Sequence, residues 1–464
     1  MLGTTSWSFA PYKPLLFDTG DIYICRLYPG DGTIGLDWLP SENATGYTVC
    51  WRNRKALTWE NAAYVEGTSY TITGLPNETD YEIQVLCGIK KSRIRLARTG
   101  SVPGNVVVNY LHPEDDAYGF SGHYLCSPSL VRSPDGALIA SMDVFEGGAP
   151  QDLSLLFHSD DDGKTWHYLT ELFPCFWGKL FVHRGALYML SVSTEYGDLL
   201  IGRSDDCGRT FGTPTVLLRG SSGFRQKGVH KNPQPVITHD GRLWCTLEWG
   251  SWASGTHAAM CMSANENADL LDPASWHFTP PVPYDPTWPG TAVGNSPGCI
   301  EGCMVVSPAG WNGHDEPQLL NIMRYQIGGC KPNFGLAVVM AVDGIDEPLR
   351  FERTIEFPGN HSKFMIKQSP SDGKYYSLVS YLTPEHPDGR NWLVLIRSTD
   401  LLHWDKVQDV FDYRHLPIVE VGFQYVDFFF EGNTILYLSR TAYNGAHNFH
   451  DANYSVFGKL TVEG

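Results

Sequence analysis

The chain has 464 residues and a formal net charge of −17 at pH 7, and 18% of its residues are charged. This negative charge disfavours nucleic acid or an anionic membrane surface as a partner, because both are themselves negative. The low share of charged residues, the 13% of aromatic residues, the 47 glycines and the 30 prolines indicate a folded protein of many short strands joined by tight turns.

Cysteine usage and the first residues bear on the cellular compartment. The eleven cysteines are scattered, and Cys299 and Cys303 have no second matching pair, so their spacing does not predict a zinc site. Scattered thiols favour a reducing environment. Met1 to Leu16 lacks a basic segment followed by an apolar one, and no stretch of the chain is long enough to span a bilayer. We therefore expect a cytoplasmic protein, with a secreted protein whose leader is missing from this sequence as the alternative.

Residues 21–100 form the first predicted domain, after an N-terminal segment at residues 1–20. Apolar and polar residues alternate as in half-buried strands at 34–38, 46–51 and 70–75. An early tryptophan strand and a late strand opened by Tyr81, after a Leu-Pro-Asn turn, form a tyrosine-corner pattern. The segment resembles a fibronectin type III module, which implies a β-sandwich with a spacer or docking role. Residues 101–118 are expected to be a linker or a ring-closing strand.

Two similar turns follow, at residues 159–166 and 204–211. Each reads Ser-x-Asp-x-Gly-x-Thr-aromatic between two strand patterns. The Asp is expected to accept hydrogen bonds from nearby backbone N–H groups, the Gly to adopt a positive φ, and the aromatic ring to anchor the turn in a packed layer. A weaker copy lies at residues 398–404. These turns resemble the Asp-box of sialidase-type β-propellers.

The fold class that this resemblance implies is all-β. Residues 119–464 show repeated strands and turns without a long amphipathic helix. We expect a six-bladed, sialidase-like β-propeller over these residues, preceded by the fibronectin III-like β-sandwich; seven blades remain an alternative.

The resemblance to sialidases also extends to single residues. The family's first strand carries an arginine that binds the substrate carboxylate, but this chain has Cys126 there. A thiol cannot make that bidentate bond, which leaves a different acidic sugar, or a neutral one, open as the substrate. The other positions match better, and the resemblance implies that Tyr425 is the nucleophile, that Glu301 is its base, and that Arg324 and Arg390 bind the anionic group of the substrate.

This set of residues has a chemical rationale. A sugar with a carboxylate on its anomeric carbon repels a carboxylate nucleophile, so a neutral phenol attacks more readily. A tyrosine with a pKa of about 10 needs a base to remove its proton. Most glycosidases use two carboxylates, whereas sialidases are an exception with a tyrosine nucleophile.

The general acid and the remaining pocket residues are less closely defined by the sequence. Asp143, at the end of an apolar strand, is our first choice for the acid because its apolar neighbours raise a carboxyl pKa; Glu146 and Asp152 are alternatives. His230 and Lys363 begin strand patterns that could point at the axis, and they could replace the charge of the missing arginine. Glu146 is also a candidate for substrate binding.

The sequence thus predicts an exo-glycoside hydrolase that releases a terminal acidic sugar, sialic acid or a related one, from glycans with retention of configuration. One alternative is a polysaccharide lyase that acts on uronic acids with Tyr425 or His230 as the base. A non-catalytic glycan-binding propeller is another. No cofactor and no metal site are expected, because the His-x-x-His of residues 447–450 lacks a third defined ligand. The expected partner is a glycan, and the oligomeric state is left open.

Overall fold

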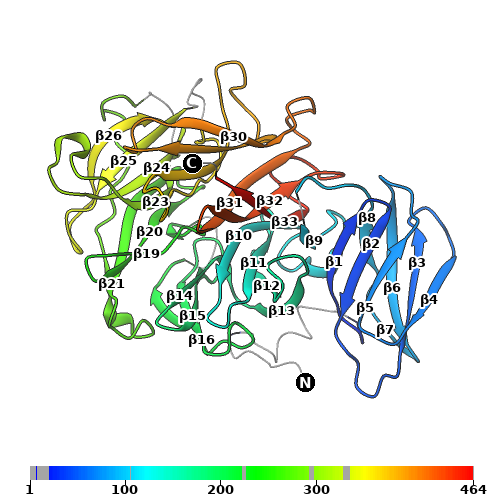
Figure 1. The fold of residues 1–464 in the computed structure, drawn as a ribbon. Coiled ribbons are helices and arrows are strands. Elements are labelled where there is room, and N and C mark those ends of the chain that lie inside the picture. The colour runs from blue at the N-terminus through cyan, green and yellow to red at the C-terminus, as the bar shows by residue number, and fades with distance from the viewer. Residues whose placement is uncertain are drawn as a thin grey trace.

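A computed structural model gives the fold and describes residues 7, 20–104, 106–221, 226–291, 297–327 and 335–462. These residues form an almost all-β protein (Figure 1). The helices among them are three 3₁₀ turns, η1 (Asp116–Tyr118), η2 (Pro273–Ser275) and η3 (Trp311–Gly313). No helix in this part of the chain is long and apolar enough to cross a membrane.

Residues 24–98 form two antiparallel sheets, which we call the N-terminal module. One sheet has the order β1-β2-β5 and the other the order β4-β3-β6-β7, with β8 also paired to β6. The strands are β1 (Ile24–Gly30), β2 (Thr33–Trp38), β3 (Tyr47–Asn53), β4 (Asn61–Val65), β5 (Ser69–Thr73), β6 (Asp80–Cys87), β7 (Lys90–Lys91) and β8 (Arg95–Arg98).

The described residues from Val106 onward form six further antiparallel sheets in sequence order, named I to VI here. Sheets I and II contain β10 (Tyr124–Arg132), β11 (Leu138–Phe145), β12 (Leu153–Ser159) and β13 (His167–Leu172), then β14 (Phe176–His183), β15 (Ala186–Val192), β16 (Leu199–Ser204) and β17 (Thr215–Leu218). Sheet III contains β18 (Gly228–His230), β19 (Ile237–His239), β20 (Arg242–Ser251), β21 (Thr256–Asn265) and β22 (Trp276–Phe278).

Sheets IV and V follow the same pattern, and sheet VI ends the chain. Their strands are β23 (Pro297–Val306), β24 (Leu319–Ile327), β25 (Leu336–Ala341) and β26 (Arg350–Glu356), then β27 (Lys367–Gln368), β28 (Tyr375–Ser380), β29 (Trp392–Ser398) and β30 (Asp405–Asp412). Sheet VI contains β31 (Gly422–Glu431), β32 (Thr434–Ala442), β33 (Tyr454–Thr461) and, as its outer strand, β9 (Val106–Tyr110) from the start of this region.

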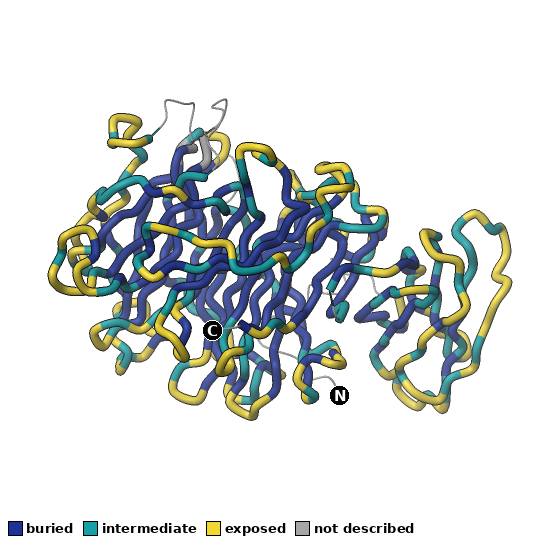
Figure 2. The backbone as a smooth tube through the Cα atoms, turned by 45° about the horizontal axis from the view of Figure 1, so that its top comes forward, coloured by how far each residue is buried: buried dark blue, intermediate teal, exposed yellow. Residues whose placement is uncertain are grey.

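The hydrophobic cores lie between successive sheets. Each sheet shares one core with the next sheet in the series from I to VI. A further core joins sheet VI to sheet I. In the last of these, Leu436 and Phe457 of sheet VI pack with Leu138 and Phe157 of sheet I. The six sheets therefore form a closed ring whose strands are buried while its loops are exposed (Figure 2).

The two aromatic-ended turns have the hydrogen bonds that their sequence predicts. In the first, Asp161 accepts hydrogen bonds from the backbone N–H of Thr165 at 2.9 Å and from its hydroxyl at 2.7 Å. Gly163 has a φ of +84°, and Trp166 is fully buried. The second turn repeats these contacts through Asp206 and Thr210, at 2.8 and 2.6 Å.

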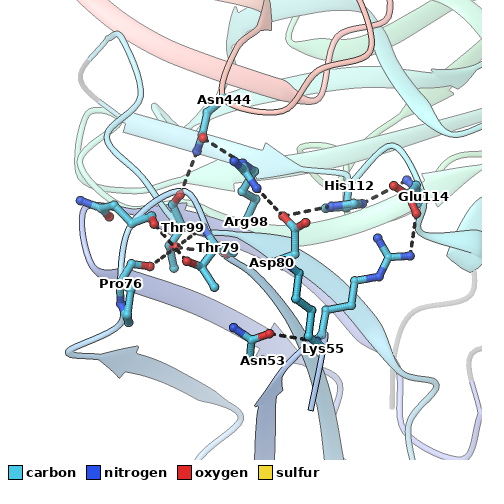
Figure 3. Close-up of polar contacts among 12 residues, drawn as sticks. Asn53, Lys55, Pro76, Thr79, Asp80, Arg98, Thr99, His112, Glu114 and Asn444 are labelled. Carbon is cyan, nitrogen blue, oxygen red and sulfur yellow. Dashed lines mark hydrogen bonds and ion pairs between the residues drawn. The ribbon is translucent and has the colours of Figure 1, made fainter. Parts of the chain in front are cut away.

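The N-terminal module lies against one side of the ring, next to β9 (Figure 1). Figure 3 shows part of the polar junction, in which Arg98 donates to Asp80 at 2.9 Å and to Asn444 at 3.1 Å. Asn444, from the loop after β32, also donates to the carbonyl of Thr99 at 3.0 Å. The module's own hydrophobic core includes Tyr454 of sheet VI, so the two parts share buried surface.

Candidate active site

Four of the predicted residues meet although they come from three sheets. Tyr425 lies on β31 of sheet VI, Glu301 on β23 and Arg324 on β24 of sheet IV, and Arg390 lies just before β29 of sheet V. The Tyr425 hydroxyl donates a hydrogen bond to Glu301 Oε1. Arg324 Nη1 contacts the other oxygen, Glu301 Oε2, at 2.6 Å. The Glu301 carboxylate therefore binds a phenol with one oxygen and a guanidinium with the other.

Backbone bulges position these side chains. The pairing of β23 with β24 and that of β31 with β32 each shift register at one point, and Glu301 and Tyr425 lie in these shifts with φ of +54° and +56°. The first strands of sheets I and II have the same feature at Ser127 and Trp177, with φ of +48° and +50°. Non-glycine residues in this conformation are strained and concentrate at functional sites. The bulge thus recurs at corresponding places around the ring.

The charges of the pair suit a neutral phenol beside an ionised base. Burial opposes the charged form of Glu301, but the neighbouring Arg324 and His230 outweigh it, so the pKa of Glu301 is lowered. Burial raises the pKa of Tyr425, and the charge of Glu301 raises it further. Tyr425 is half-buried, so a ligand can reach its ring, whereas Glu301 and Arg324 are buried. At neutral pH the pair therefore holds its proton on the phenol oxygen.

The two predicted arginines lie side by side. Arg324 Nη2 and Arg390 Nη2 donate to the same carbonyl oxygen, that of His361, at 2.9 and 3.0 Å. Arg390 also donates to the side-chain oxygen of Gln424. Its Nε is buried without a hydrogen-bond partner, and burial together with the charge of Arg324 lowers its pKa to about 9. Within the described residues Arg390 has no carboxylate partner.

A third arginine, Arg440 on β32, belongs to the site and was not among the predicted residues. Its guanidinium carbon lies 5.0 Å from the ring centre of Tyr425 and 4.5 Å from that of Phe145. Arg440 is 4% exposed, donates to the His450 carbonyl, and has a buried Nε without a partner. Like Arg390, Arg440 forms no ion pair with a carboxylate among the described residues. In the β31–β32 hairpin, Arg440 pairs with Gln424, the residue before Tyr425. Counting residue pairs back from the turn at 432–433 could therefore have placed Arg440 beside Tyr425 from the sequence.

Cys126, which the sequence resemblance sets against the first arginine of sialidases, is buried on β10. Burial raises the pKa of its thiol, while the positive charge of Arg440 acts in the opposite direction. Arg440 of sheet VI therefore brings a guanidinium into the electrostatic surroundings of Cys126.

The candidate acid Asp143 lies on β11, opposite Cys126. It accepts hydrogen bonds from the Ser154 hydroxyl at 2.5 Å and from the Gly178 N–H at 3.4 Å. Burial raises its pKa to about 7, in the direction that its apolar neighbours predict. Among the described residues, no hydrogen bond or ion pair joins Asp143 to Tyr425 or Glu301.

The other two acid candidates differ in environment. Glu146 is partly exposed, directly after β11, and contacts His123 Nδ1, directly before β10, at 2.5 Å. Burial raises the pKa of Asp152 to about 6.

His230 and Lys363 lie beside the central contact without touching it. His230 Nδ1 contacts Glu248 Oε2 at 2.6 Å, and Glu248 Oε1 accepts the N–H of Gly302, next to Glu301. Burial disfavours the charged imidazole, but Glu248 overcomes this and raises the pKa of His230. Lys363 donates to the Pro233 carbonyl at 3.3 Å, and its Nζ lies 5.9 Å from the ring centre of Tyr425. The described residues include no group of three or more His, Cys, Asp or Glu side chains placed to bind a metal ion.

No protein-family model and no curated protein matches the chain. Several solved structures resemble it. An α-L-arabinanase of Penicillium chrysogenum, complexed with arabinobiose, has a TM-score of 0.50 at 15% identity and covers 77% of this chain and 98% of its own. A Hadza microbial sialidase has a TM-score of 0.50 at 13% identity, covering 96% and 94%. The GH93 α-L-arabinofuranosidase of Fusarium graminearum has a TM-score of 0.50 at 12% identity, covering 77% and 97%. The chain therefore has a sialidase-like propeller fold.

Proposed function

We propose that the protein is a retaining exo-glycosidase that releases a terminal acidic sugar, sialic acid or a related sugar, from glycans. The contact of Tyr425 with Glu301, flanked by Arg324, carries this proposal, because it provides a neutral nucleophile next to an ionised base. In the same proposal, the ring of sheets I to VI is a six-bladed propeller and the N-terminal module is a fibronectin III-like docking domain.

The proposed reaction has two steps. In the first, Tyr425 Oη attacks the anomeric carbon and its proton passes to Glu301, while Asp143 gives a proton to the departing glycosidic oxygen. A covalent glycosyl-tyrosine forms and the glycosidic bond breaks. In the second, Asp143 takes a proton from water, the water oxygen attacks the anomeric carbon, and the Tyr425 oxygen leaves and recovers its proton from Glu301.

The arginines support an acidic sugar over a neutral one. Arg390 and Arg440 are buried cations whose contacts in the described structure are carbonyl oxygens, an amide oxygen and aromatic faces. A buried charge without an opposite charge is costly. A substrate carboxylate would offset that cost, and a neutral sugar would not. The arabinose-acting proteins of the same fold make a neutral pentose the natural comparison substrate.

The test is a panel of aryl glycosides of sialic, ketodeoxy and uronic acids together with an aryl arabinofuranoside. We expect hydrolysis of an acidic glycoside, and a loss of at least about a hundredfold in kcat/KM for Tyr425→Phe and for Arg440→Leu. Tyr64→Phe and Arg209→Leu are the matched controls, because both side chains are exposed, and they should keep full activity.

Three results would contradict the proposal. Hydrolysis of the arabinofuranoside alone would replace the acidic sugar by a neutral one. An ultraviolet-absorbing unsaturated product would indicate a lyase. Binding of the glycosides without turnover would indicate a glycan-binding propeller.

A further inference from the structure

The first strands of sheets II, III, V and VI, and the residues beside them, bring together four lysines and Asp427. Lys179 lies on β14, Lys231 directly after β18, Lys363 before β27, and Lys367 on β27. Lys179, Lys231 and Lys363 are at most 4% exposed, and Lys367 is half-buried. Asp427 on β31 is the acidic neighbour of Lys179, Lys363 and Lys367, whereas Lys231 has Asp143 as its acidic neighbour and Lys363 is also influenced by Glu301. The lysines come from sheets II, III and V, and Asp427 comes from sheet VI, so the cluster is assembled from several sides of the ring.

The carboxylates offset only part of the positive charge, and one oxygen of Asp427, Oδ1, is buried without a hydrogen-bond partner. Asp427 Oδ2 contacts Lys179 Nζ and also accepts the N–H of Leu130 at 2.7 Å. Lys231 Nζ instead donates to the carbonyls of Trp177 and Asn232, at 3.2 and 3.0 Å. Neither Lys231, Lys363 nor Lys367 forms an ion pair with any described residue. The cluster therefore holds more positive than negative charge in a place that water hardly reaches.

The ammonium groups remain charged near neutral pH in spite of their burial. Burial lowers the pKa of Lys231, Lys363 and Lys367 to about 8 each, and the charge of Lys179 adds to this effect. An unpaired buried ammonium is costly, so the folded state gains if an anion joins the cluster.

Asn232 marks the point where an anion fits best. Lys231 Nζ binds the carbonyl of Asn232 and Lys363 Nζ binds the carbonyl of the next residue, Pro233, so the two ammonium groups flank this short segment. The Asn232 side chain is 1% exposed, and both its amide nitrogen and its amide oxygen are buried without a hydrogen-bond partner. The hydroxyl of Ser362, next to Lys363, is likewise buried and unpartnered. Two cations thus bind the carbonyls of one short segment, residues 232–233, which carries the unpartnered amide of Asn232, and the unpartnered Ser362 hydroxyl is adjacent to Lys363 in the chain.

We propose that this chain binds one small inorganic anion of halide size on the axis of the ring, held by the ammonium groups of Lys231 and Lys363 and by the side-chain amide of Asn232. Lys179 and Lys367 add to the positive potential there, while the burial of the contacting groups limits the size of the anion. The site is close to the proposed catalytic residues, since Lys363 Nζ lies 5.9 Å from the ring centre of Tyr425 and Lys231 is an electrostatic neighbour of Asp143, so the test is made without substrate.

The experiment measures thermal unfolding of the full chain without substrate, in sodium gluconate with increasing chloride at constant ionic strength. We expect the unfolding midpoint to rise with chloride and to saturate after about 3 °C, as for a ligand that binds the folded state alone. Bromide should act in the same way, and sulfate should not. A midpoint that does not respond to chloride, or that responds to sulfate alone, would overturn the proposal.

Two variants locate the site. Lys231→Met should lose the chloride response, whereas Lys459→Met, at an exposed lysine, should keep it. Asn232→Asp places a carboxylate where the anion would be, so in gluconate it should unfold at a higher temperature than the native chain, with no further rise in chloride. If Lys231→Met does not fold, the test rests on Asn232→Asp. The assignment is wrong if Asn232→Asp is less stable than the native chain in gluconate and its unfolding midpoint still rises with chloride.

A crystal soaked in bromide provides an independent check. Its anomalous difference map should contain a peak within contact distance of Lys231 and Lys363. A well-ordered axis with no such peak would overturn the proposal even if chloride stabilised the protein in solution.

Discussion

The carboxyl group of Asp143 is buried and accepts hydrogen bonds from a hydroxyl and a backbone N–H. In the unfolded chain it loses its proton near its usual pKa of 3.8, whereas burial raises the pKa in the folded chain to about 7. Between these two values the folded state binds more protons than the unfolded state, so stability falls as the pH rises.

This residue therefore gives a pH-dependent prediction. Asn cannot ionise, so Asp143→Asn should remove this contribution, which amounts to about 4 kcal/mol at 1.36 kcal/mol per pH unit. The measurement is the free energy of unfolding in urea of the native protein and of Asp143→Asn. The native value minus the variant value should decrease by that amount between pH 4 and pH 8.

The matched control is Asp160→Asn, which removes an exposed carboxyl. Its curve of stability against pH should run parallel to that of the native protein. Parallel curves for Asp143→Asn as well would mean that Asp143 is not held as the neutral acid.

Single residues also show how far sequence reasoning reached. Tyr425, Glu301, Arg324 and Arg390 were placed in one pocket by resemblance alone, and the structure brings them together. Arg440 was missed because no motif marks it, and its place beside Tyr425 follows only from counting the strand register back from the turn at 432–433. The positive φ of Glu301 and Tyr425 had no sequence signal either, because neither residue is a glycine.

At the scale of elements, the aromatic-ended turns were predictable because the hydrogen bonds that shape them are local. In the first turn, a serine, an aspartate, a glycine and a threonine within seven residues form four of these hydrogen bonds. The register shifts in the inner strands, by contrast, depend on how each strand pairs with its neighbour. They could be identified only once the pairing was known.

Gly163 in the first turn gives a prediction for this scale. Its φ is +84°, and a Cβ built there would lie 2.1 Å from the Phe457 ring of sheet VI. Gly163→Ala should therefore combine backbone strain of about 1–2 kcal/mol with an overpacking cost of about 1–3 kcal/mol. Urea unfolding should show a destabilisation of about 3 kcal/mol.

Gly136 is the matched control because it has a similar φ, +91°, with no atom within 4 Å of a built Cβ. Gly136→Ala should cost about 1–2 kcal/mol, from the backbone alone. Equal losses in the two variants would mean that the contact of the turn with sheet VI adds nothing to stability.

At the scale of the whole molecule, the junction between the N-terminal module and the ring decides whether the chain unfolds as one unit. The repeat pattern predicted many strands, but the closing of sheet VI by β9 and the sharing of Tyr454 with the module's core depend on contacts between distant parts of the chain. At the junction Arg95 of β8 forms a buried ion pair with Asp115 at 2.7 Å and donates to the Ile24 carbonyl.

Because this ion pair is buried, removing one partner leaves an uncompensated charge. Arg95→Met should cost about 3–5 kcal/mol. Arg54→Met removes a cation of the same junction whose pair with Glu114 is partly exposed, and it should cost less than about 1 kcal/mol. Calorimetry of the native chain should show one cooperative transition, and Arg95→Met should move that whole transition to lower temperature, since the module and the ring share a core. Two separate transitions, of which only the lower moves in Arg95→Met, would show instead that the module unfolds on its own while the ring stays folded.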